Sequence, residues 1–312
     1  MTNRDIVLSS SLRPTDLGSS SHDDESFRKL AKETKRPRSV GVSVFRHAAP
    51  QFAAPSNSIS NGGEWDRFLH PEPTPDRVWE SLSPTPLDAA KLLEKGLFIN
   101  AQQSSVATSF DILRTRVLHA MQQNGWRRLA ITSPTHGCGK SFVATNLALS
   151  LARCPSSRTA LLDLALRQPG LGALLGLPDV ATIRGYLNGE QPLESHFHRF
   201  GRTLALGLNG TAMQDAAEVL HEPATAAVLS TMVRQLDPDM VVIDAPPVLG
   251  SDDFLALLPH VDAALLIIDG TKTTASEVRT CERLLAAQCP LIGVMMNRAQ
   301  DLSLRRPRFG RR

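Results

Sequence analysis

The sequence predicts an α/β fold, with a mostly parallel β-sheet flanked by helices. Short, continuously apolar segments alternate along the chain with longer segments whose apolar residues recur at helical spacing. Strands that are apolar along their whole length are typical of parallel sheets covered by helices on both faces. Several of these segments end in a carboxylate or an amide, and the carboxyl ends of parallel strands form the edge where ligands bind.

The best-defined segment comprises residues 129–153. Its first three residues are apolar and predict a buried strand, a turn that contains two glycines follows, and an amphipathic helix begins near Lys140. A strand, a glycine turn, a Lys-Ser pair and a helix, in that order, are typical of a phosphate-binding loop. Pro134 stands where the usual pattern has its first glycine. The prediction therefore rests on the buried strand before the loop and the amphipathic helix after it.

The residue types in this loop suit the binding of a Mg-nucleotide. Gly137 and Gly139 allow the positive φ angles with which backbone N–H groups converge on a phosphate. We expect Lys140 to reach the β- and γ-phosphates and Ser141 to hold Mg²⁺. The expected nucleotide-binding residues of the loop are Pro134, Thr135, His136, Gly137, Cys138, Gly139, Lys140 and Ser141.

Further apolar segments predict the other strands of the sheet. They cover residues 159–163, 203–208, 240–244, 263–269 and 291–297. Helices are expected over residues 109–122, 214–220, 224–236 and 275–288. Polar residues stand where four of the strands end: Asp163, Asp244, Asp269 and Asn297. Beside a glycine loop, two such carboxylates indicate a Mg²⁺ site, with Asp244 at the metal and Asp163 at the metal or acting as a base.

The composition divides the chain into three parts. Residues 1–100 contain many Ser, Pro and Gly residues and few apolar clusters, which predicts a largely disordered N-terminal region with short helices over 24–35 and 86–95. Residues 101–302 are expected to form the nucleotide-binding domain. Residues 303–312 form a basic tail, which could contact anionic lipid or an acidic partner, or only keep the chain soluble.

Charge and cysteine content narrow the class of protein. A net charge of +3 does not indicate a specific nucleic acid partner, and the four cysteines have no paired or zinc-like spacing. The apolar runs fall short of the roughly 20 residues that a membrane span needs. We therefore expect a cytoplasmic protein that meets the inner face of the plasma membrane only through a partner or through its basic tail.

Five blocks of sequence resemble, in order and spacing, the cytoplasmic domain of bacterial tyrosine kinases, which belong to the wider MinD and ParA group of P-loop ATPases. The blocks are SPTHGCGKSFVATNLALSLA, ALLDLALRQPGL, MVVIDAPPVLGSDDFLAL, VDAALLIIDGTKTTASEV and PLIGVMMNRA, all within residues 102–302. These kinases regulate the synthesis and export of exopolysaccharide and capsule. The resemblance implies ATP and Mg²⁺ as cofactors and a membrane polysaccharide co-polymerase, or chain-length protein, as partner. It implies catalytic roles for Lys140, Asp163 and Asp244, a metal site at Ser141, Asp163 and Asp244, and a contact of Asn297 with the nucleotide base.

The chain also departs from the family pattern at three points. Ala165 replaces the second aspartate of a D-x-D motif, and a positioned carboxylate base typically contributes roughly 10²- to 10⁴-fold to rate. The oligomerisation motif E-x-x-R-x-x-R is present only as Thr108, Asp111 and Arg114. The single tyrosine is Tyr186, so phosphorylation of a tyrosine cluster in the tail is not expected.

Two other functions remain compatible with the sequence. The three departures are consistent with a catalytically weakened nucleotide-binding scaffold that serves a membrane co-polymerase, alone or as a homo-oligomer. A partitioning ATPase of the ParA or MinD type is less favoured, because Thr135 stands where those proteins carry a second lysine early in the loop.

Overall fold

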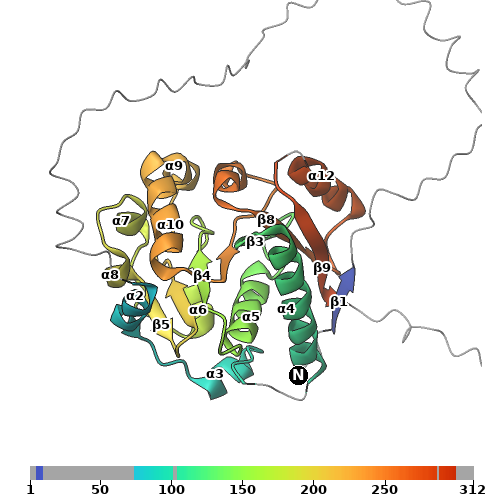
Figure 1. Ribbon diagram of the computed structural model, residues 1–312. Coiled ribbons are helices and arrows are strands. Elements are labelled where there is room, and N and C mark those ends of the chain that lie inside the picture. Colours follow the sequence, from blue (N-terminus) through green and yellow to red (C-terminus); the bar gives the residue numbers. More distant parts are fainter. Residues whose placement is uncertain (1–4, 10–73, 101–103, 287, 300–312) are drawn as a thin grey trace, which may run out of the picture. The chain divides into compact units, whose positions relative to one another are not determined.

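The computed structural model describes residues 5–9, 74–100, 104–286 and 288–299. These residues form one sheet of nine strands in the order β1-β9-β8-β3-β7-β4-β6-β5-β2 (Figure 1). The strands are β1 Asp5–Ser9, β2 Ser83–Pro84, β3 Arg128–Thr132, β4 Thr159–Asp163, β5 His198–Phe200, β6 Leu204–Gly207, β7 Met240–Asp244, β8 Ala263–Asp269 and β9 Leu291–Ala299. The six strands from β9 to β6 in this order are mutually parallel, whereas β1 is antiparallel to β9 and β5 is antiparallel to β6.

Helices connect most of the strands. Within the described part they are α2 Pro75–Ser81, α3 Ala89–Glu94, α4 Ser105–Asn124, α5 Lys140–Ala152, α6 Leu171–Leu175, α7 Arg184–Leu187, α8 Leu193–His196, α9 Ala216–His221, α10 Pro223–Leu236, α11 Asp253–Leu257 and α12 Ala275–Ala286, with a short 3₁₀ helix at Leu258–His260. Helix α4 buries the face that its spacing predicts, from Phe110 to Met121. It ends at Gly125, which adopts the left-handed conformation that favours glycine.

The sheet is buried on both faces, as the apolar strands predict. Leu129 and Ile131 of β3 pack in one core layer with apolar side chains of α4, α5 and α6, and α4 and α5 lie side by side on this face (Figure 1). The intervening Ala130 packs in the other layer with side chains of α7, α9, α10, α11 and α12. Alternate side chains of a strand point to opposite faces, so a parallel sheet with helices on both sides needs apolar residues at every position.

The folded part of the chain begins before residue 100, which corrects the predicted extent of the N-terminal region. Helix α2 buries Val78 and Trp79, and the Trp79 indole Nε1 donates a hydrogen bond to the carbonyl of Leu236, 2.7 Å away. Residues 83–84 add a short edge strand beside β5. The composition of this segment resembles a linker, but a few large side chains are enough to hold it against the sheet domain.

The segment around α3 is held against the opposite face. The side chain of Asn146 on α5 donates to the carbonyl of Gly96 at 3.2 Å and accepts from the amide of Phe98 at 3.1 Å. Leu92 and Leu97 are buried in the core layer beneath α4 and α5. The helix predicted over residues 86–95 is thus present as α3, whereas the helix predicted over 24–35 and the basic tail over 303–312 lie outside the described residues.

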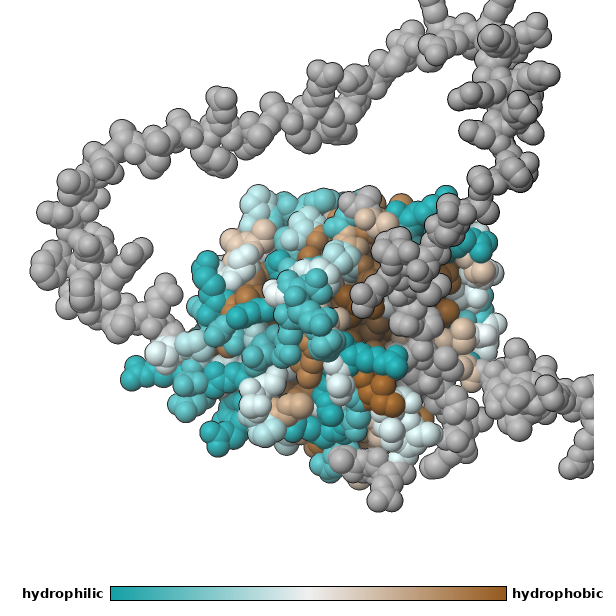
Figure 2. Space-filling model, turned by 45° about the vertical axis from the view of Figure 1, so that its right-hand side comes forward, coloured by the Kyte–Doolittle hydropathy of each residue, from teal (hydrophilic) through white to brown (hydrophobic). Residues whose placement is uncertain are grey.

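The surface of the described part carries few large apolar side chains. Leu93, Ile112, Leu255 and Leu284 are exposed by 39–46%, and they belong to four different helices. On the face shown in Figure 2, hydrophobic residues are visible in several separate places between hydrophilic ones. Isolated apolar residues of this kind are ordinary on protein surfaces.

Candidate nucleotide-binding site

The phosphate-loop candidate lies between β3 and α5, where the sequence predicts it. Gly137 has a φ of 80° and Gly139 a φ of 94°, and Gly139 is the N-cap of α5. The φ of Gly139 requires glycine, and a Cβ atom there would lie 2.1 Å from the side-chain Nδ2 of Asn297, which would have to leave its place. The N–H groups of the first turn of α5 therefore point out of the carboxyl edge of the sheet, as an anion site requires.

Two buried carboxylates lie next to each other beside this loop. Strands β4 and β7 are neighbours in register, and Asp163 pairs directly with Asp244 at their carboxyl ends. Both side chains are 0% exposed. One oxygen of Asp163 accepts hydrogen bonds from the amides of Gly170 and Leu171, at 3.0 Å each. The other oxygen of Asp163 and both oxygens of Asp244 accept no hydrogen bond of ordinary geometry, although the Ala165 amide and the Ser141 hydroxyl lie close enough to favour the charged forms.

Burial and mutual repulsion make this pair hard to ionise. Burial raises the pKa of Asp163, and the charge of Asp244 raises it further, against the amides of Leu171, Gly170 and Ala165. Burial also raises the pKa of Asp244, opposed by the Lys140 charge and, to a smaller extent, by the Ser141 hydroxyl. Without a cation the pair is therefore expected to retain a proton at pH values where an exposed carboxyl group is ionised.

The donor set of this pair fits a Mg²⁺ ion. Three buried carboxylate oxygens without a hydrogen bond of ordinary geometry are unfavourable unless a cation or a donor satisfies them, and Mg²⁺ prefers oxygen ligands. Asp163, Asp244 and Ser141 would hold the ion. No group of three or more His, Cys, Asp or Glu residues among the described residues could hold a metal, so its other ligands would be phosphate and water oxygens, as is usual for Mg²⁺ at nucleotide sites.

A pocket of about 130 Å³ opens at the loop. It is lined by His136, Gly137, Lys140, Ser141, Ala165, Arg167, Gln168, Pro246, Pro247 and Asp253. Burial and then the neighbouring Lys140 charge lower the pKa of His136, so its imidazole is neutral at pH 7. Arg167 and the buried Asp253 form an ion pair at one side, in which Nε lies 3.0 and 2.7 Å from the two carboxylate oxygens.

Asp269 and Asn297, the other two polar residues at strand ends, do not line this pocket. Asp269 accepts hydrogen bonds from Thr271 and from the Arg298 guanidinium. Asn297 donates through Nδ2 to the carbonyl of Cys138, at 2.9 Å. Its side chain thus lies against the loop, and the expected contact with a nucleotide base stays a prediction.

The structure brings most of the expected site residues together. Lys140, Ser141, His136 and Gly137 line the pocket, whereas Pro134, Thr135, Cys138 and Gly139 belong to the loop without lining it. The sequence offered a weak signal for the Arg167–Asp253 pair, because both residues follow strand ends in motif blocks. It offered none for the contacts of Arg298.

A buried strand, a glycine loop with Lys140 at its end and two adjacent strand-end aspartates define the class of the protein, a nucleotide-binding P-loop protein. The family model described as "ParA: NUBPL iron-transfer P-loop NTPase" matches residues 126–302. The chain belongs to this family of P-loop NTPases.

Three individual proteins illustrate the similarity. The putative tyrosine-protein kinase EpsB of Ralstonia nicotianae is 31% identical over 205 residues, which make up 64% of this chain and 26% of that protein. The tyrosine-protein kinase etk of Escherichia coli K12 is 25% identical over 228 residues, 66% of this chain and 30% of that protein. The solved VpsO kinase domain is 27% identical, with a TM-score of 0.55, and covers 62% of this chain and 96% of that domain.

The chain thus matches only about a quarter to a third of the length of these two full-length relatives. It matches nearly the whole of the solved kinase domain. None of the helices in the described residues combines the length and apolar character needed to cross a membrane.

Proposed function

We propose that this chain acts as a bacterial protein-tyrosine kinase domain, which uses Mg-ATP to phosphorylate tyrosine in exopolysaccharide or capsule synthesis or export. One observation carries the proposal: the buried Asp163–Asp244 pair has three oxygens without a hydrogen bond of ordinary geometry, directly beside a loop that presents Lys140 and Ser141. The relatives named tyrosine-protein kinase support this choice among the many functions of P-loop proteins.

Each of these residues has a role in the proposed transfer. The loop N–H groups and the N-terminus of α5 bind the phosphates, and Lys140 stabilises the charge that develops on them. Ser141 and Asp244 hold Mg²⁺, which when bound supplies positive charge at the transferred group. Asp163 assists at the metal or accepts the proton of the tyrosine hydroxyl, and a raised pKa suits a base that works near neutral pH.

The acceptor tyrosine is proposed to belong to another polypeptide. The one tyrosine in the sequence, Tyr186, is 2% exposed and packs against Phe197 and His196. Burial raises its pKa, so its hydroxyl is neither accessible nor easily deprotonated in the folded chain. A membrane polysaccharide co-polymerase, acting at the cytoplasmic face of the membrane, remains the proposed partner.

A second candidate function is a nucleotide-binding scaffold with weak or no transfer activity. Ala165 lines the pocket with a methyl group where a second carboxylate is expected from the family pattern. At the position of the oligomerisation motif, the Asp111 carboxylate already accepts hydrogen bonds from Arg153 and Ser150 of the same chain, so it is less suited to bind a second copy. In this case ATP acts as a ligand that stabilises one conformation, and the same co-polymerase is the proposed partner.

Two further assignments have less support. The first is a partitioning ATPase of the ParA or MinD type, because the exposed Thr135 stands on the loop where those proteins carry a second lysine. Iron transfer, which the family description names, would need a set of thiolate or histidine ligands, and Cys138, Cys281 and Cys289 are each buried. We propose residues 101–302 as the kinase-like domain, to which the folded segment 74–100 is added.

The test measures Mg-ATP binding and phosphoryl transfer by the purified chain, with Lys140→Ala as the control variant. Binding is followed by calorimetry, and transfer by the appearance of phosphotyrosine on a tyrosine-containing polymer and of free ADP. Wild-type transfer that Lys140→Ala abolishes would support the kinase, and Ala165→Asp should then accelerate it by roughly 10-fold or more. Binding without transfer would favour the scaffold. The absence of any Mg-ATP binding by the wild-type chain would refute both functions.

A further inference from the structure

The carbonyl groups of the phosphate loop are held from outside by the end of strand β9. The Nδ2 of Asn297 donates to the carbonyl of Cys138 at 2.9 Å, and the Nη1 of Arg298 donates to the carbonyl of Gly137 at 2.9 Å. Two consecutive carbonyls of the loop are therefore bound by two consecutive residues that lie about 160 positions later in the sequence.

This arrangement fixes the direction of the neighbouring N–H groups. The C=O and N–H of one peptide plane point in opposite directions, because the peptide bond is planar and trans. When the carbonyls of Gly137 and Cys138 are held on the outside, the N–H groups of Cys138 and Gly139 face the opposite way, as a phosphate-binding concavity requires. A free loop could rotate these planes, since glycine permits both directions.

The guanidinium of Arg298 is itself held in place by β8. The Oδ2 of Asp269 lies 2.5 Å from Nη1 of Arg298, and the other oxygen of Asp269 accepts from the amide and the hydroxyl of Thr271. Although burial acts to raise the pKa of Asp269, its hydrogen bonds to Thr271 and then to Arg298 hold that pKa below its usual range. Asp269 is thus an anion that is 1% exposed and paired with one arginine.

The backbone at Arg298 is strained, which indicates that this placement is specific. Arg298 has a φ of 54°, a conformation uncommon for residues other than glycine. Both polar atoms of the Asn297 side chain form hydrogen bonds, since its Oδ1 accepts from the backbone N–H of Arg298 at 3.0 Å while its Nδ2 donates to Cys138. Strained positions of this kind persist where the surrounding contacts over-determine them, often at binding sites.

We propose that Asn297 and Arg298 are positioning residues for the phosphate loop, with Asp269 holding Arg298, and that they set the affinity for the phosphate part of the nucleotide. The proposal rests on phosphate binding by the loop and is independent of tyrosine kinase activity.

The experiment compares Kd values for Mg-ADP and for inorganic tripolyphosphate with Mg²⁺, by calorimetry, in the wild type and in Arg298→Gln. The loss of a charge-assisted hydrogen bond that orients a binding group is expected to weaken both ligands about 10- to 100-fold and by the same factor. The Arg298→Lys variant keeps the charge beside Asp269 and one donor, so it should recover part of the affinity for both ligands.

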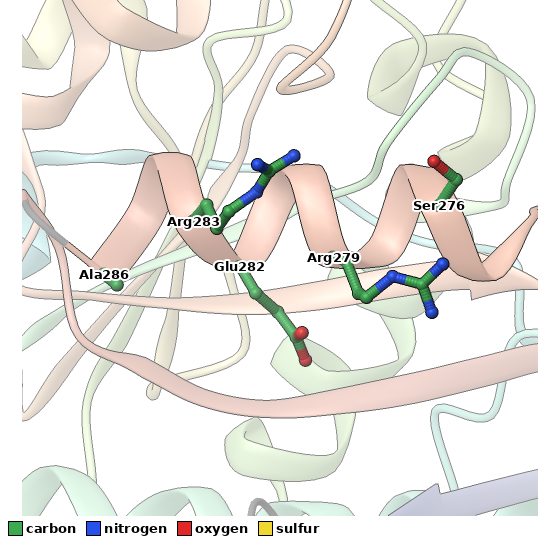
Figure 3. A pocket seen from close by; sticks show the side chains of 5 residues that line it. All are labelled: Ser276, Arg279, Glu282, Arg283 and Ala286. Atoms are coloured by element: carbon green, nitrogen blue, oxygen red, sulfur yellow. The ribbon is translucent and has the colours of Figure 1, made fainter. Parts of the chain in front are cut away.

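The matched control is Arg279→Gln. Arg279 is an exposed arginine on α12, in an open hollow of about 550 Å³ that it shares with Ser276, Glu282, Arg283 and Ala286 (Figure 3). It has no part in the loop contacts, so both Kd values should stay within about twofold of the wild type. A general effect of removing a surface cation would instead appear in both variants.

Four outcomes would overturn the proposal or the phosphate binding on which it rests. Arg298→Gln could bind both ligands as the wild type does, or it could lose affinity for ADP alone, which would place Arg298 at the nucleoside. If Arg298→Gln does not fold, Asp269→Asn replaces it in the same two Kd measurements, because it keeps the contact with Thr271 and releases the guanidinium of Arg298. Unchanged Kd values for Asp269→Asn would also refute the proposal. A wild-type chain that binds neither ligand would refute phosphate binding itself, whereas one that binds both without phosphorylating tyrosine would refute only the kinase.

Discussion

The substitution Asp244→Asn tests the electrostatics of the buried pair directly. Asparagine has nearly the shape of aspartate but carries no charge, so it removes both the repulsion with Asp163 and the burial of a second anion. In the ligand-free wild type the pKa of each carboxyl is raised above its usual value of about 3.9. The folded state therefore keeps protons that the unfolded state has already released, and its free energy of unfolding falls as the pH rises above that value.

The size of the effect follows from the cost of one ionised group. A shift of one pKa unit corresponds to about 1.4 kcal/mol, and water penetration and relaxation reduce the cost at real buried sites. We expect Asp244→Asn to raise the free energy of unfolding by about 1–2 kcal/mol at pH 8 in Mg²⁺-free buffer. For a folded unit of about 200 residues this corresponds to a Tm increase of roughly 2–8 °C. The gain should be small near pH 4 and should grow as the pH rises.

The assay is thermal unfolding from pH 4.5 to pH 8, with and without Mg-ATP. Bound Mg-ATP should stabilise the wild type by mass action, and Asp244→Asn should lose most of that stabilisation because one proposed metal ligand is gone. The variant would then be more stable than the wild type without ligand and less responsive to it, as is common for substitutions at charged functional sites.

Asp262→Asn is the matched control with the opposite sign. Burial acts to raise the pKa of Asp262, but hydrogen bonds from the Arg128 side chain and from the amides of Arg127 and Arg128 hold that pKa below its usual range. Its contribution is present above the unfolded pKa and is lost as the pH falls, so Asp262→Asn should lower the Tm at pH 8. A lower Tm for Asp244→Asn at both ends of the pH range would refute our account of the buried pair.

Two other substitutions test the loop and the N-terminal segment. Gly139→Ala should weaken ATP binding more than 100-fold by calorimetry, because the φ of 94° disfavours a side chain and a Cβ 2.1 Å from Asn297 Nδ2 would displace that residue from the loop. Gly125→Ala also has a positive φ but nothing within 4 Å and lies outside the loop, so it should bind ATP normally. Wild-type affinity in Gly139→Ala would contradict the loop geometry. Trp79→Ala should lower the free energy of unfolding by about 3–5 kcal/mol in urea, and a loss below about 1 kcal/mol would show that residues 74–100 do not belong to the folded unit.

The inner strands could be predicted closely because their signal is local. The predicted strands over residues 159–163, 240–244 and 263–269 coincide with β4, β7 and β8. Each is apolar, apart from a threonine at the start of β4, and each ends in an aspartate, since a strand buried on both faces can place a charge only where it leaves the sheet. The placement of Asp163 beside Asp244 then followed from one rule, that the carboxyl ends of parallel strands share an edge.

The contacts that complete the site depend on tertiary structure and left at most a weak local signal. Arg167 pairs with Asp253, which lies 86 residues later, and Arg298 pairs with Asp269 across the ends of two strands. Neither partner can be chosen from charge alone, because the sequence holds 34 basic and 31 acidic residues. Short elements such as β5 and α11 were missed for a related reason, since they are too short to show a period.

The buried pair bears on nucleotide binding, which the kinase and the scaffold have in common. Apolar residues at positions 163 and 244 would make the ligand-free fold more stable, so the two carboxylates are a cost that a bound cation can offset. A chain that kept only the fold would have no reason to retain that cost, together with a strained Arg298 beside the same loop. Binding of a Mg-nucleotide therefore has the stronger physical support, and Ala165 bears only on how fast a bound nucleotide gives up its phosphoryl group.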